Sequence, residues 1–246
     1  MDFFHPKLIT SILVAAVYLR EWKAGRLREM ASRLRHIKIG FYLSILAFFS
    51  FLAVGMFFFD PALLNFVQNL NHPLFDAVSR GGGFLGKEAN PWMFLIGWYF
   101  LALLLQRLAW SALSFGAIFS STLASVFCHI SKMFFLRARP NSSEGPFSFF
   151  NFEAFLKEGG RFYSLPSGDV VVVAAAAYFV LLRTKNIFLR VILFLLPLAT
   201  AFSRMEVNKH WPSDTLLSLG FGLISALFVE NLLENSSLRG GRRPRA

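Results

Sequence analysis

Long uncharged apolar runs are the feature that most limits what this chain can fold into. Residues 39–59 carry no charge and residues 213–233 only two, and about twenty such residues are enough for a helix to cross the roughly 30 Å hydrocarbon core of a bilayer. Apolar residues make up 55% of the 246 residues, and the mean hydropathy is +0.53. In a bilayer each run must satisfy its own backbone hydrogen bonds, which only a helix allows. We therefore expect an all-α integral membrane protein.

Six transmembrane helices are expected from these runs and from the turns between them. The expected spans are residues 39–59, 91–105, 108–136, 166–183, 187–202 and 213–233. Residues 62–85 mix apolar and polar residues and contain Pro73 and the glycines 81–83, and we expect a re-entrant or surface-lying loop there. The predicted organisation is a basic segment over 1–38, one six-helix domain over 39–235 and a basic cytoplasmic tail over 236–246.

The N-terminal segment is expected to lie along the membrane. Its apolar run, residues 8–19, would reach only about 18 Å as a helix, which is too short to cross. No small-residue cleavage site follows, as it would in a signal peptide. The next stretch, residues 20–38, is basic and amphipathic. We interpret the segment as an interfacial amphipathic helix, with a solvated charged helix as the alternative.

The formal charge of +11 reflects membrane topology in our interpretation. The Lys and Arg residues flank apolar spans and form no continuous basic face, so we expect no nucleic-acid partner. The N-terminal segment, Arg107, residues 183–190 and residues 242–245 fall on one side of a six-span protein, which the positive-inside rule makes cytoplasmic. We thus expect a bacterial inner-membrane protein with both termini in the cytoplasm. Its single cysteine, Cys128, allows neither a disulfide nor a Cys-based metal site.

Three cations lie on the opposite, outer side, where that rule does not place them. Lys132 and Arg139 flank the outer end of the third span, seven residues apart, which on a helix would place them two turns apart on roughly one face. Arg204 lies at the outer end of the fifth span. Snorkelling explains any one of them. Three clustered cations repel one another unless they share an anion.

The start of the fourth span adds a second kind of anion-binding group. Pro166 suits the first turn of a helix, whose free N–H groups form an anion site. Ser167 can donate its hydroxyl, and Gly168 lets a ligand approach the backbone. Alone, such a triplet is usually only a helix start.

His210 and Asp214 supply a nucleophile with a partner. If the chain is helical from His210 onward, the two residues share one face, and the carboxylate can orient the imidazole. Together with the three cations they suit a phosphoryl group, which His210 would attack in line while Asp214 balances the charge of its other ring nitrogen. No metal or cofactor is needed, because the cations supply the positive field. His129 lies in a span, and the remaining histidines, His5, His36 and His72, lack a suitable setting.

The residues resemble the type 2 phosphatidic acid phosphatase superfamily of membrane lipid phosphatases. Its signature is Lys-x6-Arg-Pro, then Pro-Ser-Gly-His, then Ser-Arg-x5-His-x3-Asp. This chain carries Lys132…Arg139-Pro140, Pro166-Ser167-Gly168 and Ser203-Arg204…His210…Asp214, ten of the eleven positions in order and spacing. The resemblance implies a six-helix membrane fold and a phosphohistidine on His210 with Asp214 as its partner. It also implies phosphate binding by Lys132, Arg139, Ser167, Gly168 and Arg204.

One position departs from the signature. Asp169 stands where the family has the histidine thought to protonate the leaving oxygen. A carboxyl group can act as an acid only when it is protonated, and neighbouring cations favour the charged form. Either Asp169 cripples turnover while the pocket persists, or it is the working acid, or the leaving group needs little protonation. Diphosphates and anomeric sugar phosphates would fit the last case.

The resemblance implies a lipid phosphatase acting on the outer leaflet, with the lipid tails entering between helices. We favour lipid A 1-phosphate as the substrate, because residues 141–165 are too few for a cap domain and a bulky headgroup could approach. Undecaprenyl diphosphate and phosphatidylglycerol phosphate are the alternatives. A lipid-to-lipid phosphotransferase would use the same intermediate. A non-enzymatic binder of phosphate lipids would follow if Asp169 has disabled the site.

Overall fold

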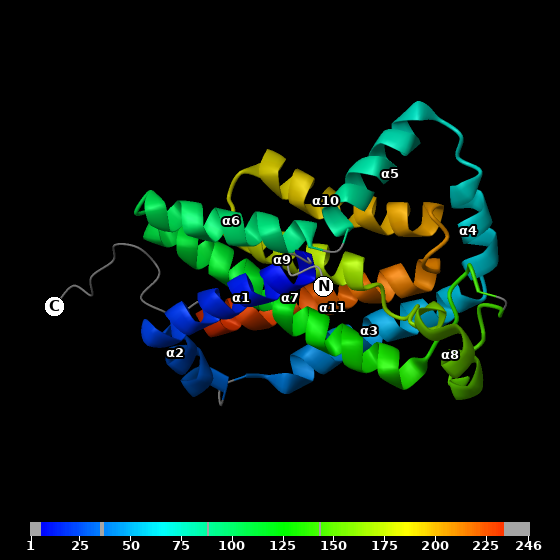
Figure 1. The fold of residues 1–246 in the computed structure, drawn as a ribbon, viewed down its shortest axis with the longest axis horizontal. Helices are drawn as coiled ribbons and strands as arrows, with labels where there is room; N and C mark the ends of the chain where they lie inside the picture. Colours follow the sequence, from blue (N-terminus) through cyan, green and yellow to red (C-terminus); the bar gives the residue numbers. More distant parts are fainter. Residues whose placement is uncertain (1–5, 35–36, 88, 143, 234–246) are drawn as a thin grey trace.

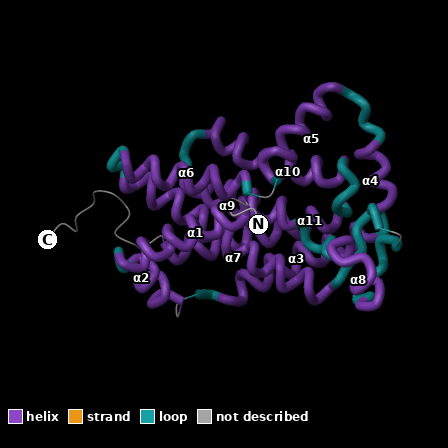
Figure 2. Tube along the Cα trace, in the orientation of Figure 1, coloured by secondary structure: helices purple, strands orange, loops and turns teal. Residues whose placement is uncertain are grey.

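The structure is a computed structural model that describes residues 6–34, 37–87, 89–142 and 144–233, and every regular element among them is helical. Figures 1 and 2 show an elongated helical bundle with the N-terminal helices α1 and α2 toward one end and α4 and α8 at the other. The all-α expectation is confirmed for the described residues.

The central helix is α9 (Gly168–Arg183), most of whose first half is buried. Three helices pack against it: α7 (Leu108–Phe135), α10 (Ile187–Glu206) and α11 (Pro212–Leu233). Two more form an outer layer, in which α3 (Ile39–Phe57) covers α11 and α6 (Asn90–Leu104) covers α7. Small residues permit the close crossings, as is usual between membrane helices. A Cβ on Gly222 would lie 2.5 Å from the Cβ of Ala174, so α11 and α9 meet almost backbone to backbone.

Among the described residues, four helices are long and apolar enough to cross a membrane: α3, α7, α10 and α11. The other two expected spans also form helices, but α6 has 15 residues and α9 has 16. At the helical rise, 15 residues reach only about 22 Å. Large apolar side chains on the outside of the bundle, such as Phe51, Phe94 and Phe188, are more than 70% exposed. Such a surface fits a lipid environment.

The predicted loop over residues 62–85 is wrong, because this segment folds into two helices, α4 (Asp60–Gln68) and α5 (Pro73–Gly86). Each has a proline in its first turn, and the side chain of His72 caps α5 by accepting from the N–H of Leu74. The glycines that suggested a loop let α5 lie directly on α10. A Cβ on Gly82 would overlap the carbonyl group of Ala199.

The N-terminal segment forms two helices docked on the bundle, α1 (Pro6–Lys23) and α2 (Arg26–Arg33). They are separated at Gly25, whose φ of 81° breaks the continuous helix that we expected. The carboxylate of Glu21 is fully buried, pairs with Arg20 and Arg26 at 2.6 Å each, and accepts the hydroxyl of Tyr99 on α6. The predicted tail lies outside the described residues.

Candidate active site

The three signature segments meet at one end of the bundle. The C-terminal ends of α7 and α10 and the N-terminal ends of α9 and α11 all lie there, joined by the segment that carries α8 (Phe152–Glu158) and the short helix η2 (Gly159–Phe162). This follows from the chain reversing direction between consecutive packed helices. The segment after α7 is held over that end by backbone bonds, including Arg139 N–H to the Arg161 carbonyl at 2.8 Å and Ser164 N–H to the Arg137 carbonyl at 3.1 Å.

His210 is 3% exposed and lies in the turn between α10 and α11. The helix does not extend back to His210, because α11 begins at Pro212, so the condition for a shared helical face of His210 and Asp214 is not met. His210 Nδ1 lies 2.8 Å from the carbonyl oxygen of Ser164 and 3.9 Å from Asp214 Oδ2. A carbonyl can only accept, so Nδ1 carries the hydrogen and Nε2 keeps a free lone pair. Ser164 is therefore the nearer partner of Nδ1, and Asp214 the second.

The surroundings of His210 favour the neutral imidazole. Burial lowers the pKa of His210 below its usual value, and the positive charges of Lys132 and Arg139 act in the same direction. The carboxylate of Asp214 opposes them. A neutral imidazole with a free Nε2 lone pair is the form that can act as a nucleophile.

Asp214 is held by a buried guanidinium that sequence reasoning missed. Arg137 is fully buried and donates to Asp214 Oδ1 at 2.6 Å and to Asp60 Oδ2 at 2.6 Å. The Arg137 guanidinium lies among aromatic rings, and its central carbon is 4.5 Å from the centre of the Phe57 ring. The other oxygen of Asp214 accepts the Ser164 hydroxyl at 2.5 Å. Both carboxylates are thus fixed in place.

Asp60 and Ser213 complete this cluster. The Asp60 carboxylate accepts the Ser213 backbone N–H at 2.8 Å and also its hydroxyl, at the start of α11. Burial raises the pKa of Asp60, while its bonds to Ser213 and Arg137 act against that shift. A signal was available in the sequence, since an Arg two residues before Arg139 and an Asp-Pro at a span end are costly to bury alone.

Lys132 and Arg139 both act on the site, but not from one helical face. The helix α7 ends at Phe135, and Leu136 takes a left-handed conformation with φ 43°, so Arg139 belongs to the following loop. Lys132 Nζ lies 3.5 Å from where a Cβ on Gly168 would be, which places the ammonium group at the start of α9. Burial lowers the pKa of Arg139, whereas the carboxylates of Asp169 and Asp214 raise it.

Arg204 joins Asp169 to α5. Its Nη1 donates to Asp169 Oδ2 at 3.1 Å, and its Nη2 lies 3.4 Å from the carbonyl oxygen of Gly83. A Cβ on Gly86 would lie 3.2 Å from the Cβ of Asp169, so α5 closes this side of the site. Asp169 occupies the position at which this chain departs from the signature, and its side chain is 32% exposed.

Three buried polar atoms at the site lack a hydrogen-bond partner. Among the described residues only four side chains carry such an atom, and three of them are Arg139 Nε, Ser167 Oγ and Arg204 Nε. A buried polar group without a partner costs free energy. Three donors left free at the meeting point of the signature segments are what a site for an anion with several oxygens requires.

The other histidines play no part in this arrangement within the described residues. His129 is exposed on the outside of α7, with Nδ1 2.8 Å from the Ser125 carbonyl, so it lies in a span but is not buried in the protein. His72 caps α5. His5 and His36 lie outside the described residues. No group of three or more His, Cys, Asp or Glu residues in the described part of the chain is placed to hold a metal ion.

Comparison with known proteins gives a family and a fold. Residues 113–237, half of the chain, match the PAP2 superfamily by sequence. No curated protein matches the chain. Of the solved structures, LpxE of Aquifex aeolicus is similar with a TM-score of 0.52 and 20% identity, over 69% of this chain and 93% of that one. A PAP2-type phosphatidylglycerolphosphate phosphatase from Bacillus subtilis gives 0.58 and 17%, over 77% and 94%. Identities this low show a shared fold.

Proposed function

This chain belongs to the PAP2 superfamily, and on that premise we propose that it is a membrane lipid phosphatase that works through a phosphohistidine on His210. The observation that supports the proposal most is the buried imidazole, which presents a free Nε2 lone pair beside three unpartnered donors. The substrate is a lipid phosphate monoester or diphosphate, and lipid A 1-phosphate is the first candidate. Undecaprenyl diphosphate and phosphatidylglycerol phosphate come next.

The first step transfers the phosphoryl group. His210 Nε2 attacks phosphorus in line with the leaving oxygen, and the bond from phosphorus to that oxygen breaks with its electron pair on the oxygen. Lys132, Arg139 and Arg204 neutralise the non-bridging oxygens, and the Ser167 hydroxyl and the start of α9 at Gly168 donate to them. Ser164 and Asp214 hold Nδ1–H as the ring becomes cationic.

The second step releases phosphate. Water attacks the phosphorus in line with Nε2, the P–N bond breaks with its electron pair on Nε2, and inorganic phosphate leaves. The proton that the water loses balances the proton that the leaving oxygen gained in the first step. No metal ion or cofactor takes part in this scheme. A lipid hydroxyl in place of water would give a phosphotransferase.

Asp169 sets the protonation of the leaving oxygen in this scheme. Its carboxylate pairs with Arg204 at 3.1 Å. Two hypotheses follow. Either Asp169 slows turnover and leaves a phosphate-lipid binder with residual activity, or the site turns over normally because Asp169 is the working acid or the leaving group needs little protonation.

The test measures phosphate release by the full-length protein in detergent micelles with lipid A, isoprenyl diphosphates and glycerolipid phosphates. His210→Ala is the blank and should fall to background, a loss of several orders of magnitude. An acid-labile, base-stable radiolabel on the protein after incubation with labelled substrate would report the phosphohistidine, and retention of that label in His210→Ala would refute the nucleophile. Asp169→His decides between the two hypotheses, since equal or lower activity in this variant removes the crippled-site hypothesis.

A further inference from the structure

We propose that the groove between α5 and α10 binds a second phosphate, carried by the leaving portion of the substrate. The inference rests on the proposed function, because it requires that a lipid phosphate is attacked at His210. It deepens that function by assigning which additional chemical group the substrate carries and which residues recognise it.

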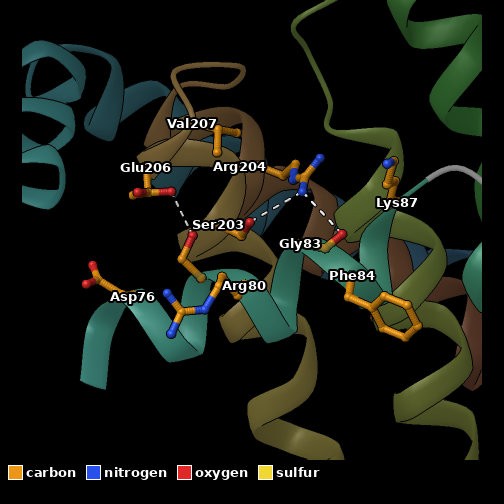
Figure 3. A pocket seen from close by; sticks show the side chains of 10 residues that line it. Asp76, Arg80, Gly83, Phe84, Lys87, Ser203, Arg204, Glu206 and Val207 are labelled. Atoms are coloured by element: carbon orange, nitrogen blue, oxygen red, sulfur yellow. Dashed lines mark hydrogen bonds between the residues drawn. The ribbon is translucent and has the colours of Figure 1, made fainter. Parts of the chain in front are cut away.

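The groove is charged and opens beside the candidate active site. Its cavity measures about 360 Å³ and is lined along one side by α5 and along the other by the end of α10 (Figure 3). Three of its side chains are cationic: Arg80, Lys87 and Arg204. Two are acidic, Asp76 and Glu206, and the carboxylate of Glu206 accepts the hydroxyl of Ser79 at 2.7 Å.

Arg204 belongs to both the site and the groove. Its Nη1 faces Asp169 at 3.1 Å, while its Nη2 faces the α5 side of the groove at Gly83. Figure 3 shows the Arg204 guanidinium and the Lys87 side chain toward one end of the groove, with Asp76 and Arg80 toward the other. Asp169 packs on Gly86, the residue before Lys87. A substrate bound with its scissile phosphate on Arg204 would therefore extend its leaving portion toward Lys87.

Lys87 and Arg80 are available for a ligand. Among the described residues no carboxylate lies within ion-pair distance of either side chain. Arg204 is paired with Asp169, whereas Lys87, at the same end of the groove (Figure 3), has no carboxylate of the described residues within that distance. The Lys87 ammonium group, together with the Arg204 Nη2 side of the guanidinium, can bind an anion with several oxygens, and phosphate offers more acceptors than a single carboxylate. The exposed Phe84 and Val207 at the groove supply apolar contacts for the lipid beyond it.

Two kinds of substrate carry such a group. In a lipid diphosphate the second phosphate is bonded directly to the leaving oxygen, and as a weak base it also needs little protonation, which suits Asp169. In lipid A the second phosphate lies on the far sugar. The chemistry recognised is the same, so the experiment compares a substrate pair for each source.

The experiment measures kcat/KM for the full-length protein in micelles with two pairs: farnesyl diphosphate against farnesyl phosphate, and bis-phosphorylated lipid A against lipid A that keeps only its 1-phosphate. The wild-type protein should prefer the bis-phosphorylated member of at least one pair by about tenfold. Lys87→Gln should remove most of that preference by lowering kcat/KM for this member, with a much smaller effect on its partner. Lys185→Gln is the matched control, because Lys185 is exposed at the other end of α9 and should leave both rates unchanged.

Each outcome is decisive. A preference in the farnesyl pair alone identifies a diphosphate, and a preference in the lipid A pair alone identifies a distant phosphate. No preference in either pair, or equal losses for both members in Lys87→Gln, overturns the inference. If the wild-type protein releases no phosphate, the proposed function fails, and binding of a farnesyl methylene-diphosphonate against a farnesyl phosphonate then tests the groove. An affinity difference below about threefold, or one that Lys87→Gln does not reduce, would count against it.

Discussion

At the scale of single residues, Arg137 holds the two buried carboxylates of the candidate site, Asp60 and Asp214, in place. It is the largest fully buried side chain among the residues that the structure describes, and it bridges two carboxylates that belong to α4 and α11. A buried ion pair adds little net stability over an apolar replacement, but removing one partner leaves an uncompensated charge. Its planar guanidinium reaches two carboxylates at once, which a lysine ammonium cannot match.

We therefore expect Arg137→Met to lower the free energy of unfolding by roughly 3–5 kcal/mol, since it leaves Asp60 and Asp214 buried without their cation. Arg137→Lys should lose less stability, because it keeps the charge. Denaturant unfolding in detergent, followed by circular dichroism, measures both. Arg161→Met is the control, because Arg161 is exposed and pairs only loosely with Glu158 at 3.5 Å. A loss in Arg137→Met no greater than in this control would contradict the expectation.

His210 gives a prediction about pH. Its pKa is lowered by burial and by the cations around it, so the neutral form persists to lower pH than in an ordinary histidine. Activity should fall only as the pH drops through this lowered value, below about 6.5. Arg139→Gln removes one of the lowering charges, so the acid limb of its residual kcat/KM should move to higher pH. Lys157→Gln, on the exposed surface of α8, is the control and should not move that limb. Because the same substrate is used for all variants, its own ionisation affects every profile equally and drops out of the comparison.

At the scale of elements, α5 is the helix that closes one side of the candidate site. Gly82, Gly83 and Gly86 face α10 and α9, where side chains would hold the helices apart. Because α5 can approach this closely, the Gly83 carbonyl reaches Arg204 and Gly86 packs on Asp169. The position of α5 therefore affects both Arg204, which we propose binds phosphate, and Asp169, which we propose lies at the leaving oxygen.

Neighbouring glycines provide a matched pair of variants on α5. A Cβ at Gly82 would overlap the Ala199 carbonyl, so Gly82→Ala should push α5 from α10 and lower kcat/KM by at least tenfold, with a lower melting temperature. Gly81 has nothing within 4 Å of an added Cβ. Gly81→Ala should therefore be neutral or stabilise the helix by about 0.5–1 kcal/mol. Phosphate release and thermal unfolding of the two variants, measured side by side, test this; equal behaviour would show that the α5–α10 contact does not matter.

At the scale of the whole molecule, the candidate site occupies one end of the bundle, and a separate group of charged residues lies at the opposite end. At that other end Arg183 pairs with Glu230, and Arg33 donates to the Leu232 carbonyl at the end of α11 at 3.1 Å. The apolar outer surfaces of the helices lie between the two ends. This layout agrees with a membrane protein whose chemistry takes place at one surface.

The proposed orientation places the site outside the cytoplasm. Cys128 is buried, so single introduced cysteines can be labelled selectively. Lys157→Cys on α8 should react with a membrane-impermeant maleimide in intact spheroplasts, whereas Lys185→Cys should react only after permeabilisation. Both side chains are exposed in the structure, so accessibility within the protein is not limiting. The reverse labelling pattern would place the site in the cytoplasm and refute the proposed localisation.

The sequence by itself determined the helical membrane class, the family and the residues of the signature. Apolar runs and a fixed spacing such as Lys132 to Arg139 are local properties, and they can be interpreted without knowing what packs on what. It misjudged segment 62–85, because glycines that make a loop in isolation also permit the closest helix contacts. The expected spans 108–136 and 213–233 match α7 and α11 to within one residue. The shared helical face of Lys132 and Arg139 was wrong, since α7 ends at Phe135 and Leu136 takes a left-handed conformation.

Only the tertiary structure decided which groups complete the site. Ser164 becomes the nearest partner of His210, and Arg137 joins Asp60 to Asp214, although these residues are 46 and 77 positions from their partners. No periodicity or motif encodes such pairings, because the places where the helices cross determine which buried charges come within reach of each other. The α5–α10 groove arises in the same way, from the approach of two helices that are far apart in the chain.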